Sequence, residues 1–295
     1  AVDNELHPTP SAEMTDTRNR GSVTVLGGGL AGMTAAFRLA STGYAVTLIE
    51  RRPYLGGRAY SFTDPDTGQQ VDNGQHVFLG CNTAYIQLLR DLGTLERTSR
   101  QRRLRIEVRS PQGRIGVLAS HPFPVPFHLL NSFLRYPHLT WAEKARAVPA
   151  LLQIRSTHQC DQPDLQRQSF GDWLRSNKQS THAIANFWDF IIVPALNDHA
   201  DNVSASMGFM VFQEALLKTN NGANIGYAKS GLSDVMGTPM AEKLASLGVD
   251  LKLSRTIESI VVCKYNRVAS VTLAGGDSVT SDRYVAALPP EVVRD

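Results

Sequence analysis

The chain has 295 residues, of which 42% are hydrophobic and 19% are charged, and its formal net charge is +3. This is the composition of a globular protein with room for two modest domains, and so small a charge gives no argument for binding nucleic acid. The three cysteines match no metal or redox spacing, and no apolar run reaches the roughly 18 residues of a membrane-spanning helix. We therefore expect a cytoplasmic protein with reduced thiols and without a metal site.

The first residues of the chain differ from the rest. Residues 1–20 are polar, contain two prolines and lack the apolar core of a signal peptide. We expect a disordered leader over this stretch, and Met14 is a second candidate for the true start.

Residues 23–50 have the pattern of a strand, a helix and a second strand. The apolar strand at 23–26 runs into a glycine-rich turn, and the strand at 45–49 ends in Glu50. Between the strands, apolar residues recur at the spacing of a helix that lies on a sheet, at Leu30, Met33, Phe37 and Ala40. The sequence therefore predicts a βαβ unit that opens a Rossmann-like α/β domain.

Three glycines in the turn have the spacing G-x-G-x-x-G, at Gly27, Gly29 and Gly32. The first permits a tight turn, the second lets a pyrophosphate approach the backbone, and the third lets helix and strand pack closely. Glu50 follows at about the 20-residue distance expected of an acid that binds a ribose hydroxyl. A glycine-rich turn that binds nothing is the alternative, and the strand, helix and acid around it argue against that.

Further groups near the turn are candidates for holding the cofactor. Leu30 and Ala31 open the helix, whose N–H groups and positive dipole end favour a phosphate. Arg51 follows the ribose acid, and Gly57 with Arg58 supplies a second backbone approach and a fixed cation. Such a second approach suits a long dinucleotide in an extended groove.

These motifs carry a resemblance to a known family. Residues 25–58 resemble the FAD-binding signature of the amine oxidase and phytoene desaturase superfamily, and the resemblance extends from about residue 23 to residue 290. Within the superfamily, residues 71–80 and 186–197 resemble the squalene-associated hydroxysqualene dehydroxylase family. The resemblance implies FAD as the cofactor and an inserted substrate domain. It also implies a further C-terminal portion, so we expect this chain to be an N-terminal part of the family fold.

The resemblance implies roles for residues outside the turn. The segment after residue 71 would return towards the flavin, which makes Gly74 and Gln75 cofactor-binding candidates and places His76 in the wall of the active site. His76 is the first candidate for a catalytic acid, and Asp72 is the second. The backbone around Ile257 is expected to contact the adenine. A plain turn at Gly74 with a structural histidine beside it is the alternative.

The middle of the chain is richer in aromatic residues and helical patterns. Arginines recur between residues 97 and 105, where a solvated strand edge is favoured over contact with lipid headgroups or cofactor phosphates. Residues 121–136 mix prolines with apolar side chains, and three interpretations stay open: a membrane-interface contact, the wall of an apolar channel, or the core of a domain.

Two helix starts in this region are predicted from capping residues. Thr140 and Glu143 have the spacing of a capping box, and Ser204 is placed to cap a later helix. Residues 183–196 are apolar on all sides and predict a buried helix. Its aromatic residues suit either a hydrocarbon pocket or an ordinary core.

The expected domain division follows from these patterns. The FAD-binding domain is predicted at residues 21–95 and 236–295, with a largely helical substrate-binding domain at 96–235 inserted between its two parts. The strand near residues 284–288 is expected to return to the parallel sheet.

The resemblance implies a FAD-dependent oxidoreductase of isoprenoid metabolism. The first hypothesis is reductive dehydroxylation of hydroxysqualene to squalene, with hydride delivered by reduced flavin to an allylic cation. A carotenoid (phytoene-type) desaturase or isomerase, in which hydride moves from substrate to flavin, is the alternative. A non-catalytic prenyl-lipid binder of GDI-like fold is the alternative from another class. The expected partner is a long isoprenoid, and peripheral contact with the inner face of a membrane is a hypothesis.

Overall fold

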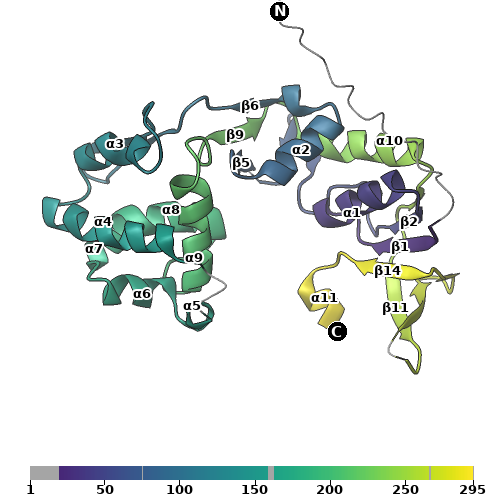
Figure 1. Ribbon diagram of the computed structural model, residues 1–295. Coiled ribbons are helices and arrows are strands. Elements are labelled where there is room, and N and C mark those ends of the chain that lie inside the picture. The colour runs from purple at the N-terminus through teal and green to yellow at the C-terminus, as the bar shows by residue number, and fades with distance from the viewer. Residues whose placement is uncertain (1–19, 75, 159–162, 266, 295) are drawn as a thin grey trace, which may run out of the picture. The chain divides into compact units, whose positions relative to one another are not determined.

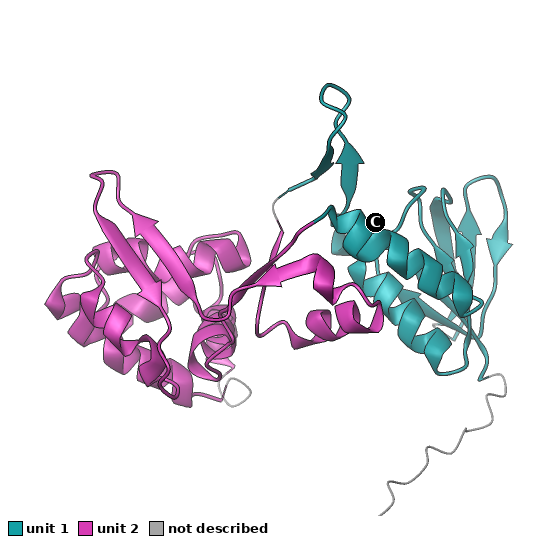
Figure 2. Cartoon of the chain, turned by 90° about the horizontal axis from the view of Figure 1, so that it is seen from above, with its two compact units in different colours: residues 1–74, 230–295 teal, residues 75–229 magenta. Residues whose placement is uncertain are grey.

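The computed structural model describes residues 20–74, 76–158, 163–265 and 267–294 (Figure 1). The chain divides into two compact units, unit 1 with residues 1–74 and 230–295 and unit 2 with residues 75–229 (Figure 2). The predicted leader lies outside the described residues except for Arg20. Residues 75–95, which the sequence patterns assign to the FAD-binding domain, fall in unit 2 in this division.

Unit 1 is an α/β domain around a four-stranded parallel sheet. The strands lie in the order β10, β2, β1, β14, and every neighbouring pair is parallel. Their bounds are β1 (Ser22–Leu26), β2 (Ala45–Ile49), β10 (Asp250–Lys252) and β14 (Arg283–Ala286). The predicted βαβ opening and the return of the last strand to the sheet are both confirmed.

Helices α1 (Leu30–Ser41) and α10 (Thr238–Ser246) contact each other beside this sheet, and the π-helical turn η6 (Ser233–Gly237) leads into α10. Met33 and Phe37 of α1 are buried, as the pattern predicted, but Leu30 is 39% exposed. Placing Leu30 on the buried face was therefore wrong. It is the first residue of the helix and lies beside the turn rather than over the sheet.

The rest of unit 1 is antiparallel. The three-stranded sheet of β11 (Ile257–Val262), β12 (Val268–Leu273) and β13 (Ser278–Val279) packs its Val271 and Leu273 against Leu26 and Ile49 at the ends of β1 and β2. Strands β3 (Ser61–Thr63) and β4 (Gln70–Asp72) form an antiparallel hairpin, and α11 (Pro290–Arg294) ends the described chain. The two sheets thereby enclose a small core directly beneath the glycine-rich turn.

Unit 2 combines two small antiparallel sheets with a group of helices. The strands are β5 (Val77–Leu79), β6 (Thr98–Arg100), β9 (Ile225–Ala228), β7 (Arg105–Arg109) and β8 (Ile115–Ala119), paired in the order β5, β9, β6 and as a β7–β8 hairpin. The α-helices are α2 (Thr83–Asp91), α3 (Leu130–Arg135), α4 (Trp141–Ser156), α5 (Asp164–Arg167), α6 (Phe170–Ser176), α7 (Thr181–Ala183), α8 (Asp189–Leu196) and α9 (Ala205–Phe212). Shorter 3-10 or π-helical turns are η1 (Leu95–Arg97), η2 (Phe127–Leu129), η4 (Ile184–Trp188) and η5 (Gln213–Leu217).

The aromatic residues of these helices form the core of unit 2. Phe170, Trp188 and Phe212 are fully buried, and the ring of Phe170 contacts both of the others. Residues 183–196 do not form the helix buried on all sides that the sequence predicted. A π-helical turn precedes α8, and in α8 only Ile192 is buried, because this helix covers the core from outside. In the described residues, no helix is both long enough and apolar enough to cross a membrane.

Candidate cofactor-binding site

The glycine-rich turn lies between β1 and α1, at the carboxyl edge of the parallel sheet. Gly27 adopts φ +100°, and its N–H donates to the Ile49 carbonyl at 2.8 Å. A Cβ on Gly32 would lie 1.8 Å from the Gly27 carbonyl oxygen. Glycine is therefore required at both positions, because the helix begins so close to the end of the strand.

Gly29, the middle glycine, has a different reason to be glycine. Its backbone is ordinary and extended, with φ −72° and ψ −179°, and a Cβ there would meet nothing nearer than the Gly57 Cα, at 3.9 Å. The second loop comes close on one side, since the Gly56 N–H donates to the Gly28 carbonyl at 2.9 Å. A Cβ at Gly29 would fit without a clash, so packing within the protein does not require glycine there. Glycine at such a position is expected where a ligand approaches the backbone.

The start of α1 has the features of an anion-binding site. Gly29 caps the helix without a side-chain hydrogen bond, and the first turn contains no acidic residue. Leu30 and Ala31, the first two residues of the helix, are exposed. The N–H groups that lack a partner within the helix and the positive end of its dipole therefore face a site that a phosphate can reach.

Glu50 lies beside the turn and is only 7% exposed. Its Oε2 accepts the Gly28 N–H at 2.6 Å, and its Oε1 accepts the Arg52 N–H at 2.8 Å. An ionised carboxylate offers about four acceptor positions, so about two remain for ribose hydroxyls. The Arg255 N–H donates to the Glu50 carbonyl at 2.9 Å, which brings the chain leading to Ile257 alongside.

Arg52 was missed by the sequence reasoning, which named Arg51 and Arg58 instead. Its Nη1 donates to the Gly57 carbonyl at 2.7 Å, and its guanidinium lies over the rings of Tyr60 and Tyr54, 5.0 and 5.8 Å from the centroids. Arg51 and Arg58 are exposed. Arg52 therefore holds the second glycine loop in place. The two tyrosines that follow Arg52 closely in the sequence were the feature from which this role could have been predicted.

Together these groups fit FAD. The open space at Gly29, the uncapped helix start and the unused acceptor positions of Glu50 match a diphosphate and a ribose in one groove. Among the described residues, no group of three or more His, Cys, Asp and Glu side chains is arranged to hold a metal ion.

Asp72, a predicted catalytic acid, ends β4. Its Oδ1 accepts the Ser61 hydroxyl at 2.7 Å and the Leu232 N–H at 2.9 Å. The carboxylate thus braces the β3–β4 hairpin against the segment that enters η6. Its catalytic role stays a prediction.

Of the four remaining predicted residues, the structure describes Gly74, His76 and Ile257. Gly74 and His76 are exposed, and they lie on either side of the division between the two units. Gln75 lies outside the described residues. Ile257 opens β11, and its side chain packs against the core of unit 1. The cofactor and catalytic roles given to these residues stay predictions.

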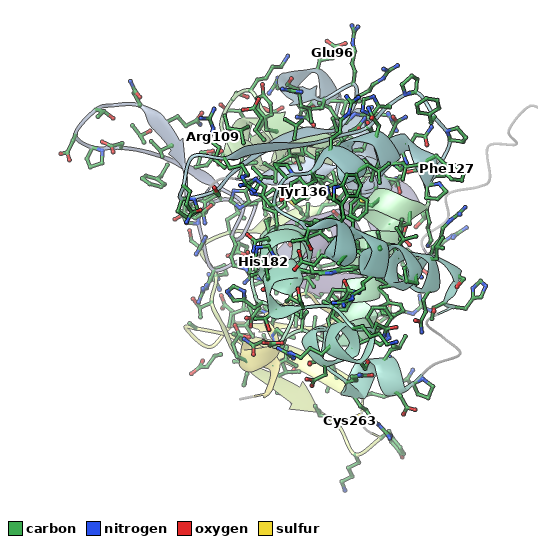
Figure 3. The ribbon with its side chains drawn as sticks, turned by 90° about the vertical axis from the view of Figure 1, so that its left-hand side faces the viewer. Glu96, Arg109, Phe127, Tyr136, His182 and Cys263 are labelled. Carbon is green, nitrogen blue, oxygen red and sulfur yellow. The ribbon has the colours of Figure 1, made fainter. Side chains whose placement is uncertain are left out.

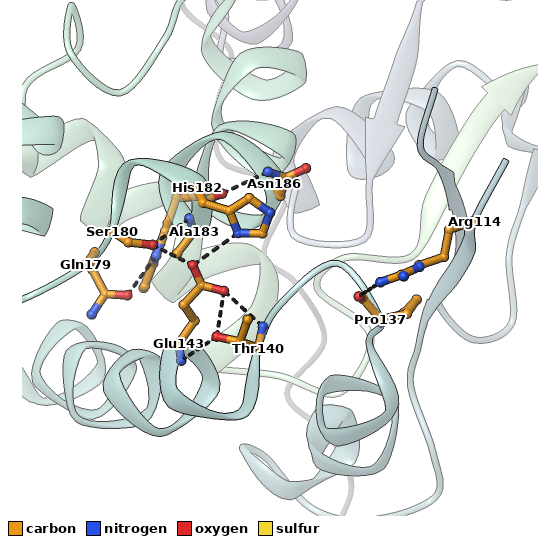
Figure 4. Close-up of polar contacts among 10 residues, drawn as sticks. Arg114, Pro137, Thr140, Glu143, Gln179, Ser180, His182, Ala183 and Asn186 are labelled. Carbon is orange, nitrogen blue, oxygen red and sulfur yellow. Dashed lines mark hydrogen bonds and ion pairs between the residues drawn. The ribbon is translucent and has the colours of Figure 1, made fainter. Parts of the chain in front are cut away.

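A polar cluster in unit 2 surrounds Glu143 (Figure 4). The predicted capping box is confirmed, because the Glu143 side chain accepts the Thr140 N–H at 2.9 Å and the Thr140 hydroxyl accepts the Glu143 N–H at 3.3 Å. The other oxygen of Glu143 accepts the Ser180 hydroxyl at 2.6 Å and lies 3.0 Å from His182 Nδ1. The Ser180 hydroxyl also accepts the Ala183 N–H, so one carboxylate joins the starts of α4 and α7.

The ionisation of Glu143 reflects this cluster. Burial raises the pKa of its carboxyl group, but the hydrogen bonds from Ser180, Thr140 and His182 outweigh burial and lower the pKa to about 2. Ser180 bonds to the carboxylate and not to the histidine, so the cluster does not have the order of a nucleophile and its base. Its task is structural.

Comparison with known proteins identifies the family. The family model described as flavin containing amine oxidoreductase matches residues 30–294. The chain belongs to this family. The membership agrees with the geometry of the turn, and FAD is the cofactor that both support.

The curated relatives of this chain include carotene desaturases. The chain is 28% identical over 281 residues to a protein of Synechococcus elongatus named "Probable zeta-carotene desaturase", covering 90% of this chain and 58% of the relative. It is 25% identical over 278 residues to the 15-cis-phytoene desaturase of an Oncidium hybrid, covering 92% and 47%. The chain thus spans about half the length of these curated relatives, which are named as zeta-carotene and phytoene desaturases.

Solved structures share the fold. A putrescine oxidase bound to putrescine superposes with a TM-score of 0.68 at 22% identity, covering 93% of this chain and 59% of that one. A RAB GDI from Plasmodium falciparum superposes with a TM-score of 0.53 at 16% identity, covering 92% and 66%. At these identities the likeness establishes the fold alone. It confirms the predicted α/β fold class.

Proposed function

We propose that this chain forms the FAD-binding part and a portion of the substrate-binding part of an oxidoreductase that desaturates a long isoprenoid of the carotene type. One observation carries the proposal: the open backbone at Gly29, with Glu50 beside it, belongs to a chain that aligns over 90% of its length with a zeta-carotene desaturase. The sequence patterns ranked hydroxysqualene first. The curated relatives name carotene desaturases, so the order of the two hypotheses is reversed.

The residues of unit 1 have defined tasks in this proposal. The N–H groups of Leu30 and Ala31 bind the diphosphate, and the carboxylate of Glu50 accepts the ribose hydroxyls. Arg52 holds the Gly57 loop against the turn, which keeps the diphosphate groove at a fixed width. When bound, FAD supplies a two-electron acceptor for hydrogen removed from a carbon–carbon bond.

Of the two interpretations that the sequence left open for the aromatic residues of unit 2, an ordinary core is the one that fits their burial. Phe170, Trp188 and Phe212 are fully buried against one another, so they stabilise the unit and do not offer a free surface to a hydrocarbon. In the proposal, the isoprenoid therefore meets other apolar residues, and its recognition rests on removing hydrocarbon surface from water.

Hydroxysqualene remains a second candidate because of the motif resemblance at residues 71–80 and 186–197. Two motif residues have local structural tasks that weaken this argument. Asn197 takes the left-handed conformation, φ 59°, that ends α8, and the Asn186 side chain donates to the His182 carbonyl at 2.9 Å. Local backbone structure therefore accounts for asparagine at both positions, at the end of α8 for Asn197 and within η4 for Asn186.

The deciding experiment is a single turnover under anaerobic conditions. The chain is loaded with FAD and mixed with phytoene or with zeta-carotene, and both flavin absorption and carotenoid products are followed. Loss of oxidised flavin in equal amount to a product that lacks two hydrogens is expected. Formation of squalene and water from hydroxysqualene by the chemically reduced holoprotein, with carotenes unchanged, would make dehydroxylation of hydroxysqualene the first hypothesis and carotene desaturation the second. FAD retention without either reaction would contradict both candidates for this chain.

A further inference from the structure

Strand β11 forms one edge of the antiparallel sheet of unit 1. Among the described residues, β12 is its only neighbouring strand in that sheet. The Cys263 N–H donates to the Arg267 carbonyl at 2.8 Å, on the side of β12. The backbone groups of successive residues point to alternate sides of a strand, so Ile260 and Val262 direct their N–H and C=O groups to the free edge. This edge therefore presents backbone donors and acceptors with which another strand can pair.

Apolar side chains of β11 are exposed on both faces of the sheet. Ile260 lies opposite the buried Val271 of β12 and thus on the core side, yet it is 37% exposed. Val261 points to the other face and is 46% exposed, and Val262 is 54% exposed. Cys263, the next residue, is also exposed, near the end of the β11–β12 hairpin (Figure 3). An edge strand with uncovered apolar side chains favours the addition of a further strand.

Charges flank the exposed part of β11 and do not interrupt it. Glu258 and Lys264 are both exposed, and the residues between them are uncharged and include no proline. Charged residues and prolines are the usual means by which edge strands avoid pairing. The register with β12 shifts between Ile257 and Ser259, which leaves residues 259–263 as the regular part of the edge. The open edge is thus short, and its two ends have charges of opposite sign.

These positions are self-complementary about Val261. Two β11 strands can pair antiparallel with Val261 opposite its own copy. The other residues that come level with each other are Ile260 with Val262, Ser259 with Cys263 and Glu258 with Lys264. In this register the apolar side chains meet apolar side chains, and each end brings a carboxylate beside an ammonium group. The residues whose backbone groups face the free edge also meet each other, as the hydrogen bonds require.

We infer that β11 is a docking edge for a second copy of this chain, which pairs through its own β11 across a two-fold axis. The pairing joins the two antiparallel sheets into one continuous sheet, and it covers apolar side chains that each copy alone leaves exposed. A two-fold axis closes the assembly at two copies. The opposite edge, β13, has only two residues and offers much less to a partner. The inference goes beyond the proposed reaction, because it involves neither cofactor nor substrate.

A cross-link tests the register directly. Ser259→Cys places a thiol opposite Cys263 of the second copy, in a background where Cys81→Ser and Cys160→Ser remove the other thiols. The two positions form a pair without backbone hydrogen bonds, and its Cα separation of about 4.5 Å is within the range of a disulfide. Within one strand the same positions are about 13 Å apart, so the bridge forms only between copies. Oxidised glutathione should give a dimer on a non-reducing gel, with the bridge located by peptide mass spectrometry.

The matched control keeps the new thiol and removes its counterpart. Ser259→Cys with Cys263→Ser, in the same background, leaves the two new thiols four residues out of register. The background chain with Cys263 alone has the same mismatch. Neither should cross-link under the conditions that join the Ser259→Cys chain.

Analytical ultracentrifugation without oxidant, cofactor or substrate measures the association itself. We expect a monomer–dimer equilibrium without larger species. Val261→Lys sets two ammonium groups against each other at the centre of the pairing and should weaken association at least roughly tenfold. Val148→Lys, at a valine of α4 that is 41% exposed, should leave association unchanged. Far-UV circular dichroism and the thermal midpoint show whether each variant folds.

Charge reversal tests the two ends of the pairing. Glu258→Lys alone and Lys264→Glu alone each oppose like charges across the two copies, and each should weaken association roughly threefold or more. The two reversals together restore opposite charges and should restore the original association. The effects of the single reversals should fade as salt rises. A double reversal that associates more weakly than either single one would contradict the register.

Other results would overturn the inference as a whole. They are a chain that stays monomeric at every concentration, cross-linking that is equally strong without Cys263, association unaffected by Val261→Lys, and assemblies that grow beyond a dimer. Loss of the dimer in a chain extended to the length of its relatives would also count against it. In that case a later segment of the same protein would occupy the edge.

Discussion

Gly29 and Gly32 belong to one motif, yet a methyl group would meet different surroundings at each. At Gly32 it would collide with the Gly27 carbonyl oxygen at 1.8 Å, and at Gly29 its nearest contact is 3.9 Å away. The motif thus mixes a glycine that the fold requires with one that only a ligand requires. This difference allows binding to be tested separately from folding.

We predict that Gly29→Ala leaves the thermal midpoint of the cofactor-free chain within about 2 °C of the original and weakens FAD binding at least roughly tenfold. Gly32→Ala should instead destabilise unit 1, because backbone has to move. Flavin fluorescence titration and calorimetry measure the two effects. If Gly29→Ala binds FAD with unchanged affinity, the placement of the diphosphate at this turn is wrong.

Glu143 illustrates a residue whose ionisation stabilises the fold. Its folded pKa of about 2 is below the ordinary value of 4.5, so its stabilisation is complete above about pH 4.5 and is lost as the pH falls towards 2. Glu143→Gln should lower the free energy of unfolding by about 2 kcal/mol at neutral pH, since several hydrogen bonds to a charged group are weakened.

The measurement for Glu143 is urea unfolding of both proteins across this pH range. The difference between the original and Glu143→Gln should shrink as the pH falls from about 4.5 to about 2. Glu107→Gln, an exposed acid on β7, serves as the control and should show a difference within about 0.5 kcal/mol throughout. A pH-independent deficit in Glu143→Gln would show that packing and not charge explains the loss.

The contact between α6 and α9 depends on a small residue. Gly208 of α9 faces the ring of Phe170 in α6, and a Cβ there would lie 2.5 Å from the ring Cγ. Gly208→Ala should destabilise the protein by about 1–2 kcal/mol, although alanine is the better helix former by about 1 kcal/mol, because overpacking outweighs propensity.

Two further variants identify the cause of the Gly208 effect. Met207→Ala, at an exposed position of the same helix, should change stability by no more than about 0.5 kcal/mol. Adding Phe170→Leu to Gly208→Ala should recover part of the deficit relative to Phe170→Leu alone, which a double-mutant cycle in urea measures. A stabilised Gly208→Ala would mean that the two helices have room to separate.

Across the whole molecule, the two units have separate cores and different relations to the cofactor. The glycine loops, Glu50 and Arg52 all belong to unit 1. We predict that FAD slows amide hydrogen exchange chiefly in residues 27–32 and 50–57, because a ligand that binds only the folded form suppresses local opening at its site. Protection confined to unit 2, measured by mass spectrometry, would contradict this placement.

Local sequence patterns were sufficient for the elements whose determinants lie close together in the chain. Strand β1, helix α1 and strand β2 follow from period and glycine spacing, and the capping box of α4 follows from two residues three positions apart. The family and its cofactor followed from the same short motifs. In each case the physical cause is a backbone conformation or a hydrogen bond, and it involves residues that are close together in the sequence.

The features that local sequence patterns left open depend on residues that are distant in sequence. Glu143 gains Ser180 and His182 from another helix, and the aromatic residues became core rather than pocket because α6, η4 and α9 pack their rings together. The outward face of α4 was equally undetermined by its period, since both of its faces are apolar. Which face is buried depends on which neighbour covers it, and that is a property of packing and not of any single stretch of sequence.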